Sequence, residues 1–111
     1  MADMIKVWLE DILKAIEEIR EFLPEPLDFR AFQSNLLVKR AVERNIEIIG
    51  EAMNRILKKE PSFPISNSRK IVDTRNRIIH GYDTVSDDVI WLICINYLPM
   101  LEKEVRALLE N

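Results

Sequence analysis

The stretch RNRIIHGY, from Arg75 to Tyr82, gathers a guanidinium, an amide, an imidazole and a phenol, and it contains the only histidine of the chain. On a helical wheel with about 100° per residue and Ile71 at zero, Arg75 falls at about 40°, in the middle of the apolar arc. Asn76 and His80 are four residues apart and share one flank. The pattern therefore directs Arg75 into an interface, where a buried guanidinium needs a partner or a polar cleft.

These groups suit the cleavage of a phosphodiester without a metal ion. His80 occupies the last turn of the expected helix, where the helix dipole favours a protonated imidazole. Gly81 turns the chain out of the helix, so Tyr82 can bring its hydroxyl back beside His80. The histidine would move protons to or from a ribose 2′-hydroxyl or the leaving oxygen, and Arg75 would hold the charge that develops on phosphorus.

The number of histidines points to a second copy of the chain. One imidazole cannot conveniently serve as both base and acid in the same reaction. A symmetric dimer would supply a second His80, and Arg75 would then line a cleft shared by two chains. A structural alternative remains open, in which Arg75 forms an internal ion pair with Glu47 or Glu51 and takes part in no reaction.

Charge is unevenly distributed along the 111 residues, whose net charge is −3. From Ser66 to Tyr82, four basic residues stand against one aspartate, a net of +3, so the rest of the chain carries −6. The overall acidity speaks against a general nucleic-acid coat. The local excess marks three residues as candidates for binding phosphate, namely Arg69, Lys70 and Arg77.

The motif must be positioned by helices, because apolar residues recur at three- and four-residue steps in four segments and no stretch alternates with period two. The first segment runs from about Asp3 to Leu23, and the second starts at an Asp28 cap and ends before Pro61, with a bend near Ser34 and Asn35. The third follows a cap in Ser66 to Ser68 and stops at Gly81. The fourth starts near Ser86, with Val85 and Ile90 as a hydrophobic staple.

These segments predict an all-α fold, an antiparallel four-helix up-and-down bundle in a single domain spanning residues 1–111. Pro99 lacks the N–H that would bond back to Ile95, so a kink or restart of the last helix is expected there. Gly50 lies inside the second helix, where glycine costs about 1 kcal/mol relative to alanine. Close approach of another helix is the favoured explanation, ahead of a ligand contact.

Cofactors and compartments are constrained by what the sequence contains. One histidine and one cysteine cannot make a closed zinc site, and no metal or other cofactor is expected. Cys94 lies in an apolar run and is interpreted as a core residue. The N-terminus is too charged for a signal peptide, and no apolar stretch reaches membrane-spanning length. We expect a cytoplasmic protein without membrane contacts.

With these residues in place, the chain resembles a known family. RNRIIHGY matches the R-x4-H-x-Y motif of the HEPN superfamily, and the chain is similar to the HepT toxin group in particular. Similar segments in that group correspond to DILKAIEEI near the start, AVERNIEIIGEAMNRI in the second helix and HGYDTVSDDVIW after the motif. The resemblance covers most of the chain.

The resemblance implies a HEPN-like homodimer with metal-independent endoribonuclease activity and a composite active site at the dimer interface. RNA is the implied substrate, and transfer RNA is a substrate of some relatives. Arg75 and His80 would be the catalytic pair, with Asn76 as the supporting polar residue. It also implies a toxin–antitoxin system, in which an MntA-type nucleotidyltransferase antitoxin neutralises the toxin by AMPylation of Tyr82.

The sequence also allows a function from another class. A non-catalytic helical module could dock a nucleotidyltransferase and bind nucleotide, and the acidic balance of the chain favours this reading modestly. Steeply salt-dependent binding of RNA would argue for the ribonuclease. Nucleotide binding without affinity for RNA would argue for the module.

Overall fold

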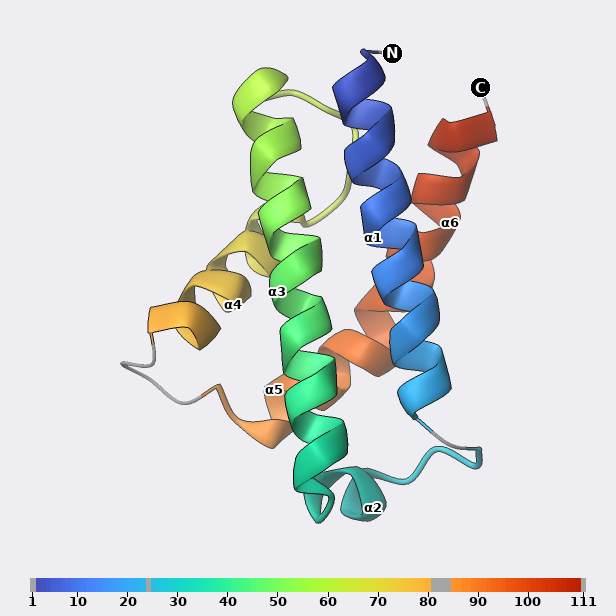
Figure 1. Ribbon diagram of the computed structural model, residues 1–111, viewed down its shortest axis with the longest axis vertical. Helices are drawn as coiled ribbons and strands as arrows, with labels where there is room; N and C mark the ends of the chain where they lie inside the picture. Colours follow the sequence, from blue (N-terminus) through green and yellow to red (C-terminus); the bar gives the residue numbers. More distant parts are fainter. Residues whose placement is uncertain (1, 24, 81–84, 111) are drawn as a thin grey trace.

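The protein is a bundle of helices (Figure 1). The structure, a computed structural model, describes residues 2–23, 25–80 and 85–110. The elements within these ranges are α1 (Asp3–Phe22), α2 (Phe29–Gln33), α3 (Leu36–Lys59), α4 (Ser68–His80), α5 (Asp87–Leu92), the π-helix η1 (Ile93–Tyr97) and α6 (Leu98–Glu110). The all-helical bundle expected from the sequence is confirmed. No helix in the described part of the chain is long and apolar enough to cross a membrane.

Helices α1 and α3 lie side by side in opposite directions and form the centre of the bundle (Figure 1). Their inward-facing residues recur at three- and four-residue steps, which places them on one stripe of each helix. Burying each such side chain contributes about 1.5–3 kcal/mol. The fully buried members are Ile5, Leu9 and Ile12 on α1 and Val42, Ile46, Ile49, Met53 and Ile56 on α3.

The second predicted helix is divided where a bend was expected. Asp28 caps α2 by accepting a hydrogen bond from the Arg30 N–H at 2.9 Å, as predicted. The Ser34 hydroxyl donates to the Arg30 carbonyl at 2.9 Å and closes that short helix. Asn35 then caps α3, its side chain accepting from the Val38 N–H at 3.1 Å. Two capping side chains in succession turn the expected bend into a full break.

The last predicted helix is continuous from α5 through η1 to α6, with one irregular turn at η1. Ser86 caps α5 as expected, accepting from the Val89 N–H at 3.3 Å. The π-helix η1 ends two residues before Pro99, and the Leu98 N–H bonds to the Ile93 carbonyl, five residues back. The predicted disturbance at Pro99 is therefore a widened turn before the proline, which accommodates the missing N–H without ending the helix.

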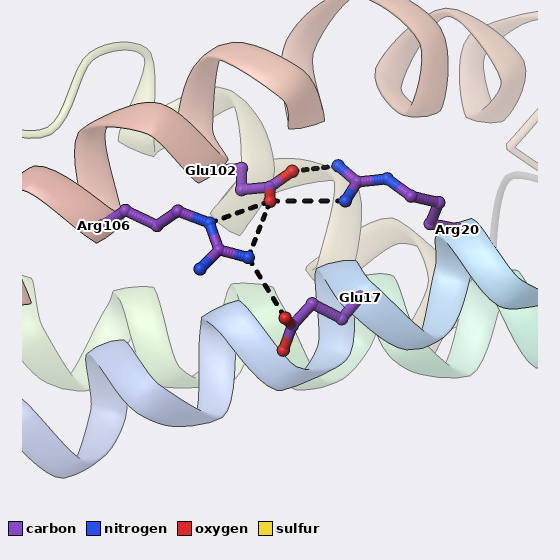
Figure 2. Close-up of polar contacts among 4 residues, drawn as sticks. All are labelled: Glu17, Arg20, Glu102 and Arg106. Carbon is purple, nitrogen blue, oxygen red and sulfur yellow. Dashed lines mark hydrogen bonds and ion pairs between the residues drawn. The ribbon is translucent and has the colours of Figure 1, made fainter.

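A charged network joins α1 to α6 at the side of the bundle (Figure 2). Glu102 is nearly buried and accepts hydrogen bonds from Arg20 and from Arg106, the latter at 3.0 Å. Arg106 also reaches Glu17 at 3.1 Å. The hydrogen bond from Arg20 is the largest cause that lowers the pKa of Glu102, with burial acting in the opposite direction and Arg106 adding to the lowering.

Helix α4, which carries the motif, packs against α3 and is inclined to the rest of the bundle (Figure 1). Its N-terminal end is anchored by the preceding segment, because the Tyr97 hydroxyl donates to the Ser66 carbonyl and Glu104 accepts from the Ser66 N–H at 3.0 Å. Its C-terminal end stands clear of α3. The helix is therefore fixed at one end and presents the motif at the other.

Candidate functional site

Arg75 lies in the contact between α4 and α3, directly over Gly50. A β-carbon placed on Gly50 would lie 2.9 Å from the Arg75 Cγ, closer still to its Cβ, and 3.2 Å from the Ile71 carbonyl oxygen. A side chain of any kind would therefore displace α4. The prediction that Gly50 permits a close helix approach is confirmed, and the residue that packs against Gly50 is Arg75 of the motif.

The Arg75 guanidinium is half-buried and bonded to its neighbour in sequence. Its Nη1 donates to the Asn76 Oδ1 at 2.9 Å. Its Nε is buried and has no hydrogen-bond partner within the part of the chain that the structure describes. A buried unsatisfied donor costs about 1–3 kcal/mol, so packing has set the position of the stem as far as Nε.

The internal ion pair considered for Arg75 does not form. Glu47 pairs with Arg44 at 3.2 Å, and Glu51 pairs with Arg55 at 2.8 Å. Across residues 2–23, 25–80 and 85–110, no carboxylate lies within ion-pair distance of Arg75. Its positive charge therefore remains uncompensated by the described carboxylates.

His80 is the last residue of α4 and is exposed. It lies five residues after Arg75, about 7.5 Å further along the helix axis. Asn76 and His80 are neighbours on one flank, at a spacing of four residues. Because Asn76 holds Arg75 Nη1, it draws the guanidinium towards the flank that carries His80. Tyr82 and Gly81, the remaining residues of the motif used in the prediction, lie outside the described residues.

The three predicted phosphate ligands lie on the exposed side of α4. Arg69, Lys70 and Arg77 are exposed, and none forms an ion pair with a carboxylate in the described ranges. On the wheel, Lys70 and Arg77 fall close together and Arg69 lies beside His80. Asp73 is the one carboxylate of α4 and is exposed on the same side, so the solvent face of α4 is a ridge of net positive charge that leads to His80.

The described residues contain no cluster of side chains suited to a metal ion. No three His, Cys, Asp or Glu side chains gather there in a suitable arrangement. Cys94 is buried between the helices, and burial raises the pKa of its thiol to about 12. Its interpretation as a core residue is confirmed.

Comparison with known proteins identifies the family. The model of the family described as Ribonuclease HepT-like matches residues 12–108. The chain belongs to the Ribonuclease HepT-like family. The match includes α3 with Gly50 and the whole of α4, so the Arg75 site lies inside the region that defines a HepT-like protein.

Several curated HepT-like relatives match over nearly their full length. The "Probable ribonuclease HepT" of Thermococcus cleftensis is 35% identical over 107 residues, which cover 93% of this chain and 94% of that protein. The protein named "Putative RNase MJ1380" of Methanocaldococcus jannaschii is 33% identical over 103 residues, covering 92% and 94% respectively. No solved structure matches.

Sequence reasoning did not foresee the contact that brings Gly50 and Arg75 together. The wheel placed Arg75 towards an interface, and the glycine was noted on its own helix, but nothing in either pattern paired them. The available signal was that a glycine inside a helix and an arginine within an apolar arc each required an explanation. In this HepT-like chain the contact between Gly50 and Arg75 explains both the glycine and the arginine.

Proposed function

We propose that the chain is a metal-independent endoribonuclease, the toxin component of a HepT/MntA-type toxin–antitoxin system. The observation that supports this most directly is the Arg75 guanidinium, which is bonded to Asn76, unpaired with any described carboxylate and drawn towards His80. The names of the relatives, "Probable ribonuclease HepT" among them, agree with RNA as the substrate.

In this proposal His80 and Arg75 divide the chemistry. His80 takes the proton of a ribose 2′-hydroxyl, whose oxygen attacks phosphorus and displaces the 5′-oxygen of the next nucleotide. Arg75 stabilises the negative charge that develops on the phosphoryl oxygens. Arg69, Lys70 and Arg77 hold the flanking phosphates as point charges along the exposed ridge.

The leaving 5′-oxygen must receive a proton, and the proposal assigns that step to His80 of a second copy. The homodimer is supported by Ile79, which lies in the apolar arc of α4 yet is 47% exposed because the C-terminal end of the helix stands clear of α3. A second copy that covers Ile79 would approach the flank that carries Asn76 and His80. The two motifs would then line one cleft.

Regulation in this proposal depends on Tyr82. An MntA-type nucleotidyltransferase would transfer AMP to its hydroxyl, and the added bulk and negative charge would occupy the positive pocket that a substrate phosphate needs. The reaction would take place in the cytoplasm. Coexpression with such an enzyme should raise the intact mass by multiples of an adenylate unit, and Tyr82→Phe should prevent this.

The activity is tested with the purified protein and a structured RNA in EDTA. The parent should cleave and leave a 2′,3′-cyclic phosphate, and a 2′-deoxy substitution at the scissile nucleotide should stop the reaction. Arg75→Ala and His80→Ala should each lower kcat by at least about 100-fold while the helical content stays that of the parent. Variants that cleave like the parent would refute the assignment of these residues.

A binding experiment separates the ribonuclease from a nucleotide-binding module. The net charge of −3 is the observation that favours the module, because RNA must approach a chain that is acidic outside α4. Binding of ATP together with a nucleotidyltransferase, without any affinity for RNA at low salt, would replace the ribonuclease with the module.

A further inference from the structure

We infer that Gly50 is a positioning residue for the guanidinium of Arg75, so that a residue on α3 controls the catalytic power of the motif on α4. This inference rests on the proposed ribonuclease function. It concerns a residue that touches neither substrate nor reacting atoms and acts through Arg75.

The contact between α3 and α4 leaves no room for a side chain at residue 50. The Arg75 stem occupies the space that a side chain at residue 50 would fill, with the hypothetical β-carbon only 2.9 Å from the Arg75 Cγ. The neighbouring atom at 3.2 Å is the Ile71 carbonyl oxygen, which belongs to the backbone of α4 and cannot rotate away. Relief therefore requires α4 itself to move outward, and the Cα of Arg75 moves with it.

Arg75 has little freedom to compensate for such a displacement. Its Nη1 is bonded to Asn76, which lies on the same helix and would move together with it. Its Nε is buried without a described partner, so the side chain already follows the packing imposed on its stem. A methyl group at residue 50 would press on the Cβ and Cγ of Arg75, so the stem must also turn relative to α4, and the guanidinium shifts with respect to Asn76 and His80 on the same helix.

A displaced Arg75 guanidinium should lower the rate of RNA cleavage. A misplacement of about 1 Å in a catalytic group can cost about 100-fold in rate, because charge stabilisation depends on a fixed geometry. None of the three atoms nearest the new methyl group belongs to Arg69, Lys70 or Arg77, and these residues keep their places relative to one another on α4, so substrate binding should be less sensitive. Gly50 should therefore affect kcat much more than KM.

The decisive variant is Gly50→Ala, measured beside Val42→Ala on the same helix. We expect Gly50→Ala to lower kcat by about 100-fold with KM within about twofold of the parent. Val42→Ala removes buried methyl groups about two turns away, so it should lower Tm while the folded protein keeps the parent kcat. A folded Gly50→Ala protein with the parent kcat would overturn the inference.

A second comparison remains informative if Gly50→Ala folds poorly. Arg75→Gly removes the stem, so the added methyl group should lower Tm less in the Arg75→Gly background than in the parent background. Free guanidinium ion at millimolar concentration should restore part of the activity of Arg75→Gly, and adding Gly50→Ala should leave the restored rate unchanged. An equal loss of Tm in both backgrounds would contradict the proposed contact.

These outcomes also separate the inference from the function on which it rests. A parent protein that cleaves no RNA would overturn the proposed function. A parent that cleaves, together with loss of activity in Arg75→Ala and full kcat in Gly50→Ala, would overturn only the role of Gly50.

Discussion

The Arg75 guanidinium donates from Nη1 to the side-chain oxygen of Asn76, the next residue in the chain, at 2.9 Å. Adjacent residues on a helix point about 100° apart, so this bond requires the long arginine side chain to bend round towards Asn76. The bend takes the charge from the centre of the α3–α4 contact to the flank of α4 that ends in His80.

Asn76→Ala should lower the rate of RNA cleavage by about tenfold, because a hydrogen bond to a charged group contributes about 1.5–3 kcal/mol and orients the guanidinium. Asn76→Asp should lower it further, since the new carboxylate would form an ion pair with Arg75 and repel phosphate. Single-turnover cleavage measures both effects. Gln33→Ala, at an exposed position on α2, is the control and should match the parent. An Asn76→Asp protein as active as the parent would contradict the role given to this bond.

The positive ridge of α4 predicts the salt dependence of RNA binding. Lys70→Ala and Arg77→Ala should each weaken binding and reduce the slope of log K against log salt by about 0.7 for single-stranded RNA. The single-turnover rate at saturating RNA should change little. Fluorescence anisotropy at several salt concentrations gives the slope, with Lys103→Ala on α6 as the control. Equal slopes for the parent and for both ridge variants would show that RNA binds elsewhere.

Glu102 predicts a pH-dependent term in stability. The hydrogen bond from Arg20 lowers the pKa of this carboxyl in the folded protein. The ionised form is therefore favoured by folding, and its contribution is fully present above the unfolded pKa of about 4.3 and is lost as pH falls through the lower folded value. Glu102→Gln should lower Tm by about 4 °C at pH 7, and the difference should shrink below about pH 4.

Thermal unfolding followed by circular dichroism from pH 3 to pH 8 measures this term. Glu110→Gln, at an exposed position near the end of the same helix, removes one carboxylate without removing the network and is the matched control. A Glu102→Gln deficit that stays constant down to pH 3 would show that the loss arises from packing and not from ionisation.

The Cys94 thiol should be unreactive towards thiol reagents in the folded protein. Burial raises the pKa of its thiol to about 12, so only on the order of one molecule in 10⁴ carries a thiolate at pH 8. A disulfide reagent should therefore react with the native protein only as fast as it unfolds, and with one equivalent in denaturant. Rapid stoichiometric reaction of the native protein would place the thiol at the surface.

Much of the fold was predictable because its signals are local. Asp28 and Ser86 cap their helices as the sequence suggested, since a cap is decided by side chains within three residues. The buried polar groups were less accessible to prediction. Asn45 donates to the Ala15 carbonyl at 3.1 Å and to Glu18 at 3.0 Å, across 30 and 27 residues of chain, and a helical wheel contains no such partner.

In the candidate site, too, the features set by local sequence were predictable, and those set by contacts between distant segments were not. The position of Arg75 in the apolar arc followed from the helical period, and the structure places it at the helix contact as expected. The inclination of α4 did not follow, because it depends on the loop that Tyr97 ties down and on the absence of a side chain at Gly50. Both are relations between segments far apart in sequence. The pairing of two copies and the role of Tyr82 stay predictions.

The π-helical turn at Ile93–Tyr97 makes α5 and α6 direct their buried faces towards different neighbours, although no loop separates the two helices. One surplus residue in a turn rotates everything that follows by about 100° relative to an uninterrupted α-helix. Trp91 before the turn can thus meet the rings of Phe29 and Phe32, while α6 after it packs against α1. Deleting a single residue within the turn would restore ordinary winding and point α5 or α6 away from its neighbours. The number of residues in this turn is therefore as much a determinant of the fold as their chemical identity.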